Sequence, residues 1–581
     1  MFEGVDDILK ELSPEQQAAC TAPNNVLLTA CPGSGKTRTL THRLAYQVLQ
    51  KSDSRKIKIA ITYTNRAAEE IINRLEDMNI DLSSIWAGTI HQFCMRYIIR
   101  PYAMYSKRLC KGYQIIDDYC KKKYGHEIAE RLGIRLRNFD DPFQYENIRT
   151  EYERLLEEKK EIDFDTILLL SEELLASCPF ISSNIASVIS SILVDEFQDT
   201  NELQYLILSN IYKANKSITL MFVGDANQAI YGSLGGVAKT KQELETLYET
   251  GFDSMSLKGC YRSTQRLVDL YSRFEVSRTE AHSVAKHKNE LGEIHFFDSV
   301  YYTDLASEIA ALIKEELENG TKAEEICVIA PQWGMLFDLS RKLRIILPDI
   351  PFDAPDISPI KYDPMNPLFL IAKLLFLPPG KNVTLRKRIA TEFISIVRDD
   401  FRIMVPDNIQ NYDVLSAVDC CRGTNTDGIT CLSSAIEKVF AILHVRISKE
   451  AALSALTNSF FDEIRSRVDR YALSTDFNSI SKYFGEKNGV VISTLHGVKG
   501  EEYTSVIAAG LLNGYLPHWD YILNPMKKLC RKNETYKLLY VLCSRAKMNL
   551  YLFSESGRTT RNGSQYTSTD ELSLIADMLL N

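Results

Sequence analysis

The sequence lacks any long uninterrupted apolar run, since no stretch approaches the roughly 20 consecutive residues that a membrane-spanning helix requires. Its first residues, M-F-E-G-V-D-D, do not place basic residues before an apolar segment, as a signal peptide does. The 13 cysteines are scattered without any C-x-x-C pair, which argues against a metal cluster or a disulfide framework. We therefore expect a cytoplasmic protein with reduced, mostly buried thiols and no membrane partner.

Neither sign of charge dominates enough to define a partner. The 581 residues include 68 Lys and Arg against 76 Asp and Glu, which gives a formal net charge of −8. This charge balance does not indicate nucleic-acid binding. It does not exclude such binding either, because phosphate contacts need only a local basic groove. At roughly 150 residues per domain, the length indicates about four domains.

Residues 26–37 join a short apolar strand pattern, V-L-L, to a glycine-containing loop and the start of a predicted helix. Such a loop turns backbone N–H groups toward an anion, and the helix N-terminus adds partial positive charge. Lys36 can reach the β- and γ-phosphates, and Thr37 can offer its hydroxyl to Mg²⁺. Ala30 stands where the pattern has its first glycine, and a small residue suffices there. The segment predicts a nucleoside-triphosphate site.

Two later strand patterns also end in polar residues. The apolar residues 191–194 lead into Asp195 and Glu196, and the apolar residues 218–223 are followed by Gln228. An Asp at the end of a strand beside a phosphate loop can contact Mg²⁺, and an adjacent Glu can orient or deprotonate the attacking water. Gln228 can bond a γ-phosphate or that water. The alternative for the two acids is a solvated turn, which leaves the nearby phosphate loop without its second metal contact.

Strand and helix patterns alternate along much of the chain, which is typical of parallel α/β sheets that bind ligands at the carboxyl ends of their strands. Ser13 is a predicted N-cap, with Pro14 at the first helical position and Gln16 at the third. Residues 96–190 are charged and helix-rich without a convincing strand pattern, and a helix is expected to start near Asp163. A second strand–helix alternation runs from residue 293 to residue 346 and resumes at residue 490.

A series of short motifs, taken in order, resembles the motifs of superfamily 1 DNA helicases of the UvrD/Rep/PcrA type. The resemblance covers roughly residues 10–275 and 485–555. The most specific motifs are D-E-F-Q-D-T at 195–200 and T-L-H-G-V-K-G-E-E-Y at 494–503. The others are a glutamine motif around Gln16, A-C-P-G-S-G-K-T at 30–37, T-Y-T-N-R-A-A at 62–68, G-T-I-H at 88–91, V-G-D-A-N-Q-A-I-Y-G at 223–232, Y-R-S at 261–263 and L-L-Y-V-L-C-S-R-A at 538–546.

The resemblance implies an α/β protein with two RecA-like parallel-sheet motor domains, each carrying a mainly helical insertion. We expect the first motor domain in residues 1–85 and 191–260 and its insertion in residues 86–190. We expect the second motor domain in residues 261–347 and 486–581, with a reduced helical insertion in residues 348–485.

The resemblance also implies that ATP and Mg²⁺ bind at one site. Gln16 would recognise adenine, Arg38 and Tyr261 would sandwich it, and Glu502 would contact the ribose. The phosphates would be bound by the loop residues Gly33, Ser34, Gly35, Lys36 and Thr37.

Catalysis would be shared between the two motor domains. Thr37 and Asp195 would hold Mg²⁺, and Glu196 would act on the attacking water. The residues that would contact the γ-phosphate are Gln228, Arg262 and Arg545, beside the catalytic Lys36. If the two arginines come from a second lobe, the γ-phosphate can draw two lobes together and hydrolysis can release them.

For the nucleic acid, the resemblance implies contacts from Tyr63, His91, Tyr231 and His496, in keeping with aromatic stacking that is independent of base sequence. The chain departs from the family pattern after Gly232. An aromatic residue and then an arginine usually follow there, but this sequence has Ser233 and Leu234. We therefore expect translocation or regulated unwinding rather than strong unwinding by the protein alone.

The sequence thus predicts an ATP-dependent DNA helicase or translocase that moves 3′ to 5′ on single-stranded or partly duplex DNA, in DNA repair or defence. The alternative is a nucleotide- and DNA-sensing ATPase subunit that regulates a partner nuclease in an anti-phage system. The reduced second insertion and the short end of the chain resemble such compact proteins, including the Gabija-type helicase subunit. An adjacent nuclease gene would favour the alternative, and an isolated gene would favour general repair.

Overall fold

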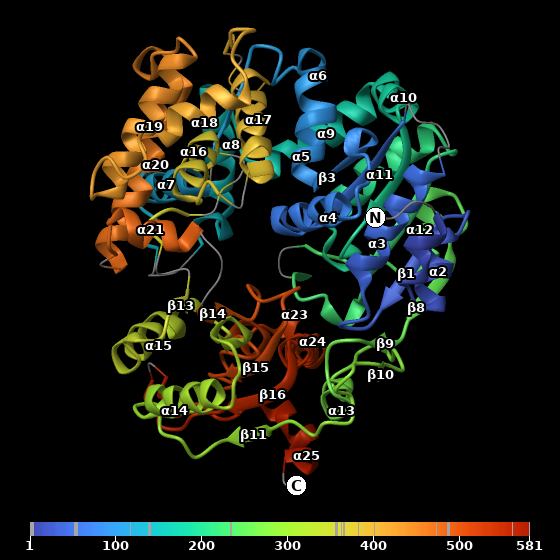
Figure 1. Cartoon of the computed structure of the whole chain (residues 1–581), viewed down its shortest axis with the longest axis vertical. Coiled ribbons are helices and arrows are strands. Elements are labelled where there is room, and N and C mark those ends of the chain that lie inside the picture. Colours follow the sequence, from blue (N-terminus) through green and yellow to red (C-terminus); the bar gives the residue numbers. More distant parts are fainter. Residues whose placement is uncertain are drawn as a thin grey trace. The chain divides into compact units, whose positions relative to one another are not determined.

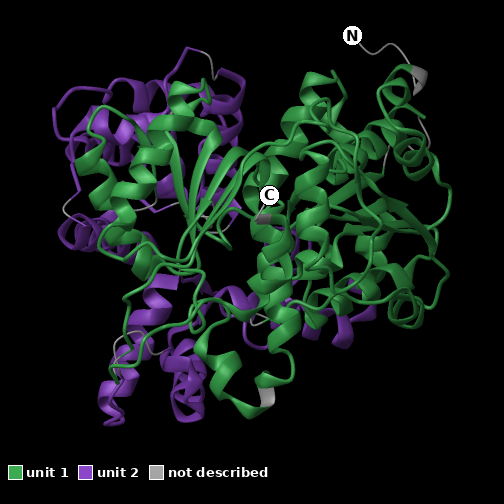
Figure 2. Ribbon diagram, turned by 90° about the horizontal axis from the view of Figure 1, so that it is seen from below, with its two compact units in different colours: residues 1–90, 182–355, 488–581 green, residues 91–181, 356–487 purple. Residues whose placement is uncertain are grey.

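The computed structural model describes residues 5–50, 56–116, 118–136, 141–232, 235–354, 358–361, 363, 366–380, 383–399, 401, 403–471, 473–484, 489–560 and 562–579. Figure 1 shows the chain and labels many of its helices and strands. The chain forms two compact units, shown in separate colours in Figure 2. The first comprises Met1–Ile90, Ser182–Pro355 and Asn488–Asn581, and the second comprises His91–Ile181 and Asp356–Lys487.

Six parallel strands form the first sheet of unit 1, in the order β3-β2-β6-β7-β1-β8. Neighbouring strands β6, β7 and β1 end near Asp195, Gln228 and the phosphate loop, so this strand order brings the three predicted site segments to one edge of the sheet. The strands are β1 Val26–Ala30, β2 Ile57–Thr62, β3 Ile85–Thr89, β6 Ile189–Val194, β7 Thr219–Gly224 and β8 Asp253–Leu257.

Helices cover both faces of this sheet, as strand β7 shows. Successive residues of a strand point to opposite faces. Met221 and Val223 join a core that includes side chains of α3 (Lys36–Leu49) and α4 (Asn65–Asp77). Phe222, on the other face, packs against Tyr205 of α11 (Glu202–Ala214) at a ring-centroid distance of 6.0 Å. Burial on both faces explains why the central strands are nearly continuous apolar runs.

A second parallel sheet in unit 1 has the order β11-β16-β15-β12-β14-β13. Its strands come from both sides of the segment that belongs to unit 2. They are β11 Ile294–Phe297, β12 Ile326–Ala330, β13 Phe352–Asp353, β14 Val490–Thr494, β15 Tyr503–Ala508 and β16 Ala546–Phe553. The two sheets confirm the predicted α/β class with two parallel-sheet domains.

Two predicted helix starts are confirmed. Ser13 caps α2 (Pro14–Thr21), and the Gln16 side chain completes a capping box by accepting a hydrogen bond from the Ser13 backbone N–H at 3.0 Å. Asp163 caps α9 (Phe164–Ser177) through a hydrogen bond from the Thr166 N–H at 2.9 Å. Both caps satisfy N–H groups that the first helical turn leaves without partners.

Three strands of the two sheets were not predicted from the sequence. Strands β3, β8 and β13 lie at sheet edges or contain only two residues, and an edge strand has no need of a continuous apolar run. In β8 the side chains of Asp253 and Ser254 are exposed, and only Leu257 is buried. Because of these polar residues, the strand has no hydrophobic pattern by which it could be predicted.

Unit 2 is mainly helical. Among its described residues, strand structure is limited to a parallel pair of two-residue strands, β4 Gln114–Ile115 and β5 Glu161–Ile162. The predicted absence of strands between residues 96 and 190 is therefore wrong at these two places, which are too short to produce an alternating pattern. The remaining long helices are α7 Asp118–Arg131, α8 Glu146–Lys159, α16 Pro367–Phe376, α17 Val383–Asp399, α18 Asn411–Asp419, α19 Gly428–Ile442, α20 Ala451–Tyr471 and α21 Phe477–Phe484.

The boundaries between the two units follow residues 90, 181, 355 and 487. The predicted insertions have different boundaries, since they cover residues 86–190 and 348–485. Strand β3 belongs to the first sheet and β13 pairs with β14 in the second, so both lie in unit 1 although the predicted insertions include them. The division into two motor domains and two insertions stays a prediction.

Candidate active site

The phosphate loop connects β1 to α3 in unit 1. Gly33 and Gly35 have φ angles of 70° and 81°, in the left-handed region that glycine adopts readily. A Cβ atom on Gly33 would lie 2.5 Å from the Cβ of Arg262, so space also requires glycine there. Ser34 is buried, and its hydroxyl donates to the Cys31 carbonyl oxygen at 2.7 Å. Because Lys36 begins α3 directly after this turn, the loop fits a phosphate group.

The residues predicted to surround adenine lie around the same loop. The Gln16 amide donates to the Ser34 carbonyl oxygen at 2.9 Å, so this side chain links α2 to the phosphate loop. Arg38 forms an ion pair with Glu11 at 3.0 Å. Tyr261 is 49% exposed, and its backbone N–H donates to the Gly33 carbonyl oxygen at 2.9 Å. Adenine recognition by these residues stays a prediction.

Two carboxylates follow strand β6 and face the start of α3. The Thr37 hydroxyl lies 3.4 Å from a carboxylate oxygen of Asp195, and the Lys36 Nζ lies 3.8 Å from one of Glu196. A hydroxyl and one carboxylate beside a phosphate site form a donor set that suits Mg²⁺, which prefers few protein oxygens together with substrate phosphates and water. No cluster of three or more His, Cys, Asp or Glu that could hold a metal ion by itself occurs in the described part of the chain.

The two neighbouring carboxylates have opposite electrostatic environments. Burial, together with the negative charge of Glu196, raises the pKa of Asp195. Burial would also raise the pKa of Glu196, but the positive charges of Lys36 and Lys499 outweigh it and lower that pKa. Glu196 also has a φ angle of 51°, a conformation that a non-glycine residue adopts at some cost and that is common at functional sites. The surrounding charges thus favour the ionised form of Glu196.

Gln228 and Arg545 connect the two sheets of unit 1. The Arg545 guanidinium donates to the Gln228 side-chain oxygen at 3.0 Å, and the Gln228 amide donates to Asp225 at 2.8 Å. Arg545 is 1% exposed and also donates to the carbonyl oxygens of Val541 and Glu501, each at 3.0 Å. Burial and the charge of Arg262 lower the pKa of Arg545 to about 9, so it stays charged at neutral pH.

Arg262 and Glu502 form an ion pair beside this connection. The Arg262 Nε lies 2.7 Å from a Glu502 oxygen, and its Nη1 donates to the Ser544 carbonyl oxygen at 2.9 Å. Burial opposes ionisation of Glu502, but the charge of Arg262 more than compensates and lowers its pKa. The Glu502 contact to ribose stays a prediction, since the structure pairs this carboxylate with Arg262.

Three of the four predicted DNA contacts form an aromatic cluster. The rings of Tyr63 and Tyr231 stack at a centroid distance of 4.6 Å, and His496 lies 5.6 Å from Tyr231. The Tyr231 hydroxyl donates to the His496 carbonyl oxygen at 3.1 Å. Tyr63 is 40% exposed, so the cluster is partly open to solvent.

The fourth predicted DNA contact, His91, belongs to unit 2. It packs edge-on against Phe164 at 5.7 Å, and burial lowers its pKa. Ser233 and Leu234, where the family pattern has an aromatic residue and an arginine, lie outside the described residues.

Sequence reasoning did not assign Asp199 or Lys499, although both lie in motifs that carry the family resemblance. The side chains of Asp199 and Lys499 are 1% and 7% exposed and form an ion pair. Lys499 also donates to the Gln228 carbonyl oxygen at 2.6 Å, and its Nζ lies 5.0 Å from the centre of the Tyr231 ring. One lysine therefore touches both the candidate ATP site and the aromatic cluster. The sequence did offer a signal for this ion pair, because each of the two most specific motifs contains one of these charged residues and neither residue had been given a role.

Among the described helices, none combines the length and the apolar character that a membrane span needs.

Comparisons with known proteins match most of the chain to helicase sequences. Residues 12–141 and 137–249 match the family described as UvrD/REP helicase N-terminal domain, and residues 437–557 match the UvrD-like helicase C-terminal domain. The protein named ATP-dependent DNA helicase PcrA from Staphylococcus aureus strain Mu50 is 24% identical over 634 aligned positions, which cover 95% of this chain and 84% of that protein. The PcrA protein of Staphylococcus epidermidis strain ATCC 12228 is 23% identical, with coverages of 96% and 85%.

Proposed function

Since the chain belongs to the UvrD/Rep family of superfamily 1 helicases, whose members are ATP-hydrolysing enzymes, we propose that it couples ATP hydrolysis to 3′-to-5′ movement along single-stranded DNA. The observation that carries this proposal is the hydrogen bond between Gln228 and Arg545. It joins a residue that follows a strand of the first sheet to one that precedes a strand of the second. Arg545 also lies close enough to the candidate phosphate site for its charge to lower the pKa of Glu196.

Each site residue has a role in this proposal. The phosphate loop and Lys36 bind the phosphates of ATP, and Thr37 and Asp195 hold Mg²⁺, which when bound neutralises phosphate charge. The ionised Glu196 accepts a hydrogen bond from the attacking water and orients it. Gln228, Arg262 and Arg545 contact the γ-phosphate, so that loss of this phosphate weakens the connection between the two sheets.

The adenosine part of ATP would bind outside the phosphate loop. Gln16 recognises the adenine edge, Arg38 and Tyr261 lie on its two faces, and Glu502 contacts the ribose. Since Glu502 is paired with Arg262, ribose binding and γ-phosphate binding share one ion pair in this proposal.

The proposal predicts that single-stranded DNA accelerates ATP hydrolysis by the wild-type protein. Lys36→Ala should abolish this stimulated activity, because it removes the only flexible cation that the phosphate loop itself supplies. Steady-state phosphate release with and without single-stranded DNA measures both effects. Turnover that is the same with and without DNA, and unchanged in Lys36→Ala, would contradict the proposed function.

The aromatic cluster is proposed to stack on bases of the tracked strand, together with His91. We expect Tyr231→Ala to weaken binding of an oligo-dT strand by about 5- to 150-fold, because one stacked base contributes ~1–3 kcal/mol. Fluorescence anisotropy with a labelled oligo-dT measures this change. Tyr412→Ala, at a tyrosine that is 72% exposed on α18, serves as the control and should bind like the wild type. Equal affinity of both variants would exclude stacking by Tyr231.

A second candidate function is an ATPase subunit that senses DNA or nucleotide and controls a partner nuclease. The sequence at Ser233 and Leu234 favours it, since the aromatic residue and the arginine of the family pattern are replaced there. Strand displacement by the purified protein, alone and with the product of any adjacent nuclease gene, separates the two functions. Unwinding without a partner supports the motor, whereas co-purification and partner-dependent activity support the nuclease-regulating subunit.

A further inference from the structure

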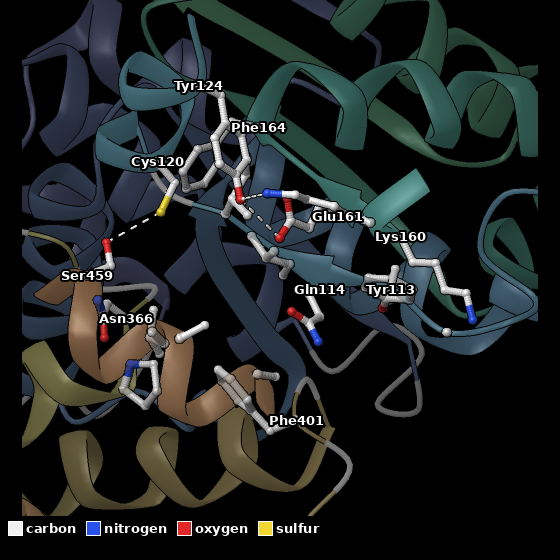
Figure 3. A pocket seen from close by; sticks show the side chains of 18 of the residues that line it. Tyr113, Gln114, Cys120, Tyr124, Lys160, Glu161, Phe164, Asn366, Phe401 and Ser459 are labelled. Atoms are coloured by element: carbon white, nitrogen blue, oxygen red, sulfur yellow. Dashed lines mark hydrogen bonds between the residues drawn. The ribbon is translucent and has the colours of Figure 1, made fainter. Parts of the chain in front are cut away.

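Unit 2 contains a cavity of about 390 Å³, a volume within the range of small-molecule sites. Its lining comes from the β4–β5 strand pair, from α7 and the start of α9, and from the second segment of the unit, including α20 and the start of α16. Figure 3 shows the Gln114 amide directed into the space between Glu161 and Phe401. The motor function proposed above uses none of these residues.

Two polar side chains lie next to each other in this cavity because of strand register. Gln114 and Glu161 are direct partners in the parallel β4–β5 pair. One Glu161 oxygen accepts a hydrogen bond from the Tyr124 hydroxyl at 3.4 Å, while the other is buried and has no hydrogen-bond partner within the described residues. The amide of Gln114 likewise makes no side-chain hydrogen bond in the described part of the chain.

The unsatisfied Glu161 oxygen requires a donor, because a buried acceptor without a partner costs about 1–3 kcal/mol. The Tyr124 hydroxyl cannot supply a second hydrogen bond, since it has one proton and also accepts from Lys159 at 2.8 Å. A bound molecule with N–H groups would satisfy both the carboxylate oxygen and the adjacent amide.

The walls of the cavity favour a flat, apolar ring. Phe164 and Phe401 contribute aromatic surface, and Ala452, Ala455 and Leu456 of α20 contribute aliphatic surface. Such walls suit stacking of a heteroaromatic base, which is worth about 1–3 kcal/mol per base in nucleic-acid binding.

The charges at the cavity favour an anionic rather than a cationic ligand. Lys111, Lys159 and Lys160 line it against Glu161 and Asp363. Lys111 and Lys160 are exposed and form no ion pair within the described residues, and Lys160 extends away from Glu161 in Figure 3. A phosphate can therefore pair with these lysines while a neutral ring occupies the apolar part.

Among nucleobases, guanine matches the two polar side chains best. Its edge carries two adjacent N–H donors beside a carbonyl oxygen. A carboxylate can only accept, which suits the two donors, and a glutamine amide can donate to the carbonyl. Adenine has one exocyclic donor on this edge next to an acceptor nitrogen, which would face the carboxylate unfavourably.

We propose that this cavity binds a guanine nucleotide, with the base on Gln114 and Glu161 between the aromatic walls and the phosphate near Lys111 and Lys160. The base could be supplied by a free nucleotide or by a guanine within a nucleic-acid strand, since both present the same edge and a phosphate. This inference goes beyond the proposed motor function.

The test uses the full-length protein saturated with a non-hydrolysable ATP analogue, so that the phosphate loop is filled. Equilibrium dialysis then measures binding of labelled GMP and AMP. We expect one GMP per chain, bound at least about tenfold more tightly than AMP, because a site built to bond a donor rejects an analogue that lacks it. Competition with guanine-containing and oligo-dA strands separates the two sources of the base. Displacement by the guanine strand alone indicates a base within a strand, and displacement by neither strand indicates a free nucleotide.

Two variants and a matched control keep the test independent of folding. Ala455→Trp fills the cavity from an exposed position of α20, and Gln114→Leu removes the amide; each should weaken GMP binding by at least about tenfold. Asn458→Trp places the same side chain at an exposed position of α20 that does not line the cavity and should leave GMP binding unchanged. Thermal unfolding verifies that all three are folded. No GMP binding, equal GMP and AMP binding, or equal binding by Ala455→Trp and Asn458→Trp would overturn the proposal. These readouts do not depend on ATP hydrolysis, so they can fail while the proposed motor function holds.

Discussion

Glu196→Gln is expected to lower the DNA-stimulated rate of ATP hydrolysis by about 10²- to 10⁴-fold, the usual contribution of a positioned acid–base group. Glutamine keeps the size of the side chain, but its amide can neither carry the negative charge nor take up a proton. The carboxylate of Glu196 accepts a hydrogen bond from Gln198 and lies 3.8 Å from the Lys36 Nζ, so its position is set from two sides. Binding of ATP should therefore change by only a few-fold.

Single-turnover hydrolysis and binding of a fluorescent ATP analogue separate these two effects. Glu130→Gln provides a control, because it makes the same chemical change at an exposed acid of α7. This control should hydrolyse ATP at the wild-type rate. If Glu196→Gln keeps more than a tenth of the wild-type rate, another group must orient the water, and the assignment of Glu196 is wrong.

Lys499→Met is expected to destabilise the protein and to remove the response of the ATPase to DNA. The ion pair of Lys499 and Asp199 is almost fully buried, and deleting one partner leaves an uncompensated charge at a typical cost of about 3–5 kcal/mol. The same lysine donates to the Gln228 carbonyl oxygen at 2.6 Å and lies 5.0 Å from the Tyr231 ring. Its loss should therefore bring the ratio of stimulated to unstimulated hydrolysis close to one.

The double variant Asp199→Asn/Lys499→Met separates the effect of Lys499 on protein stability from its effect on the response of the ATPase to DNA. Removing both charges should recover a large part of the lost free energy of unfolding, whereas the contact with Gln228 stays absent. We thus expect higher stability than in the single variant without a recovered response to DNA. Lys528→Met, at an exposed lysine of α23 (Pro525–Lys528), is the matched control. Full recovery of DNA stimulation in the double variant would contradict a coupling role for Lys499.

The decrease in the free energy of unfolding caused by Lys499→Met should also depend on pH. Burial raises the pKa of Asp199 to about 6, although the charge of Lys499 opposes this shift. An unfolded Asp has a pKa of about 3.9, so the folded state holds the proton more tightly and stability falls as pH rises between these values. Without Lys499 the pKa of Asp199 in the folded state rises further, so the loss of stability continues to higher pH. Chemical denaturation should therefore show a larger difference between variant and wild type at pH 8 than at pH 5.

Local sequence signals predicted the parts of the site that depend on local geometry. Ser13 and Gln16 define a capping box within four residues. The phosphate loop is identified by the spacing of its glycines and by Lys36. Strands β1, β6 and β7 are apolar runs because the sheet buries both of their faces. In each case the signal itself lies within a few consecutive residues.

The remaining features depend on pairings between distant residues, which no local pattern encodes. Lys499 and Asp199 meet only because the two sheets of unit 1 place their motifs together. Glu502 could be assigned to ribose by resemblance, but its ion pair with Arg262 depends on how the second sheet is assembled. The cavity beside Gln114 and Glu161 depends on a strand pair too short to leave a sequence pattern. Edge strand β8 escaped detection because its exposed polar residues cost nothing in water.

The strand order of the second sheet also has a consequence for synthesis of the chain. Strand β11 pairs with β16 and β12 pairs with β14, although unit 2 supplies much of the chain between them. The first sheet can close once β8 has emerged from the ribosome, but the second has three of its six strands still untranslated when β13 emerges. Until translation is nearly complete, β12 therefore has open edges of the kind that favour aggregation, and this interval is when the nascent protein most needs a chaperone.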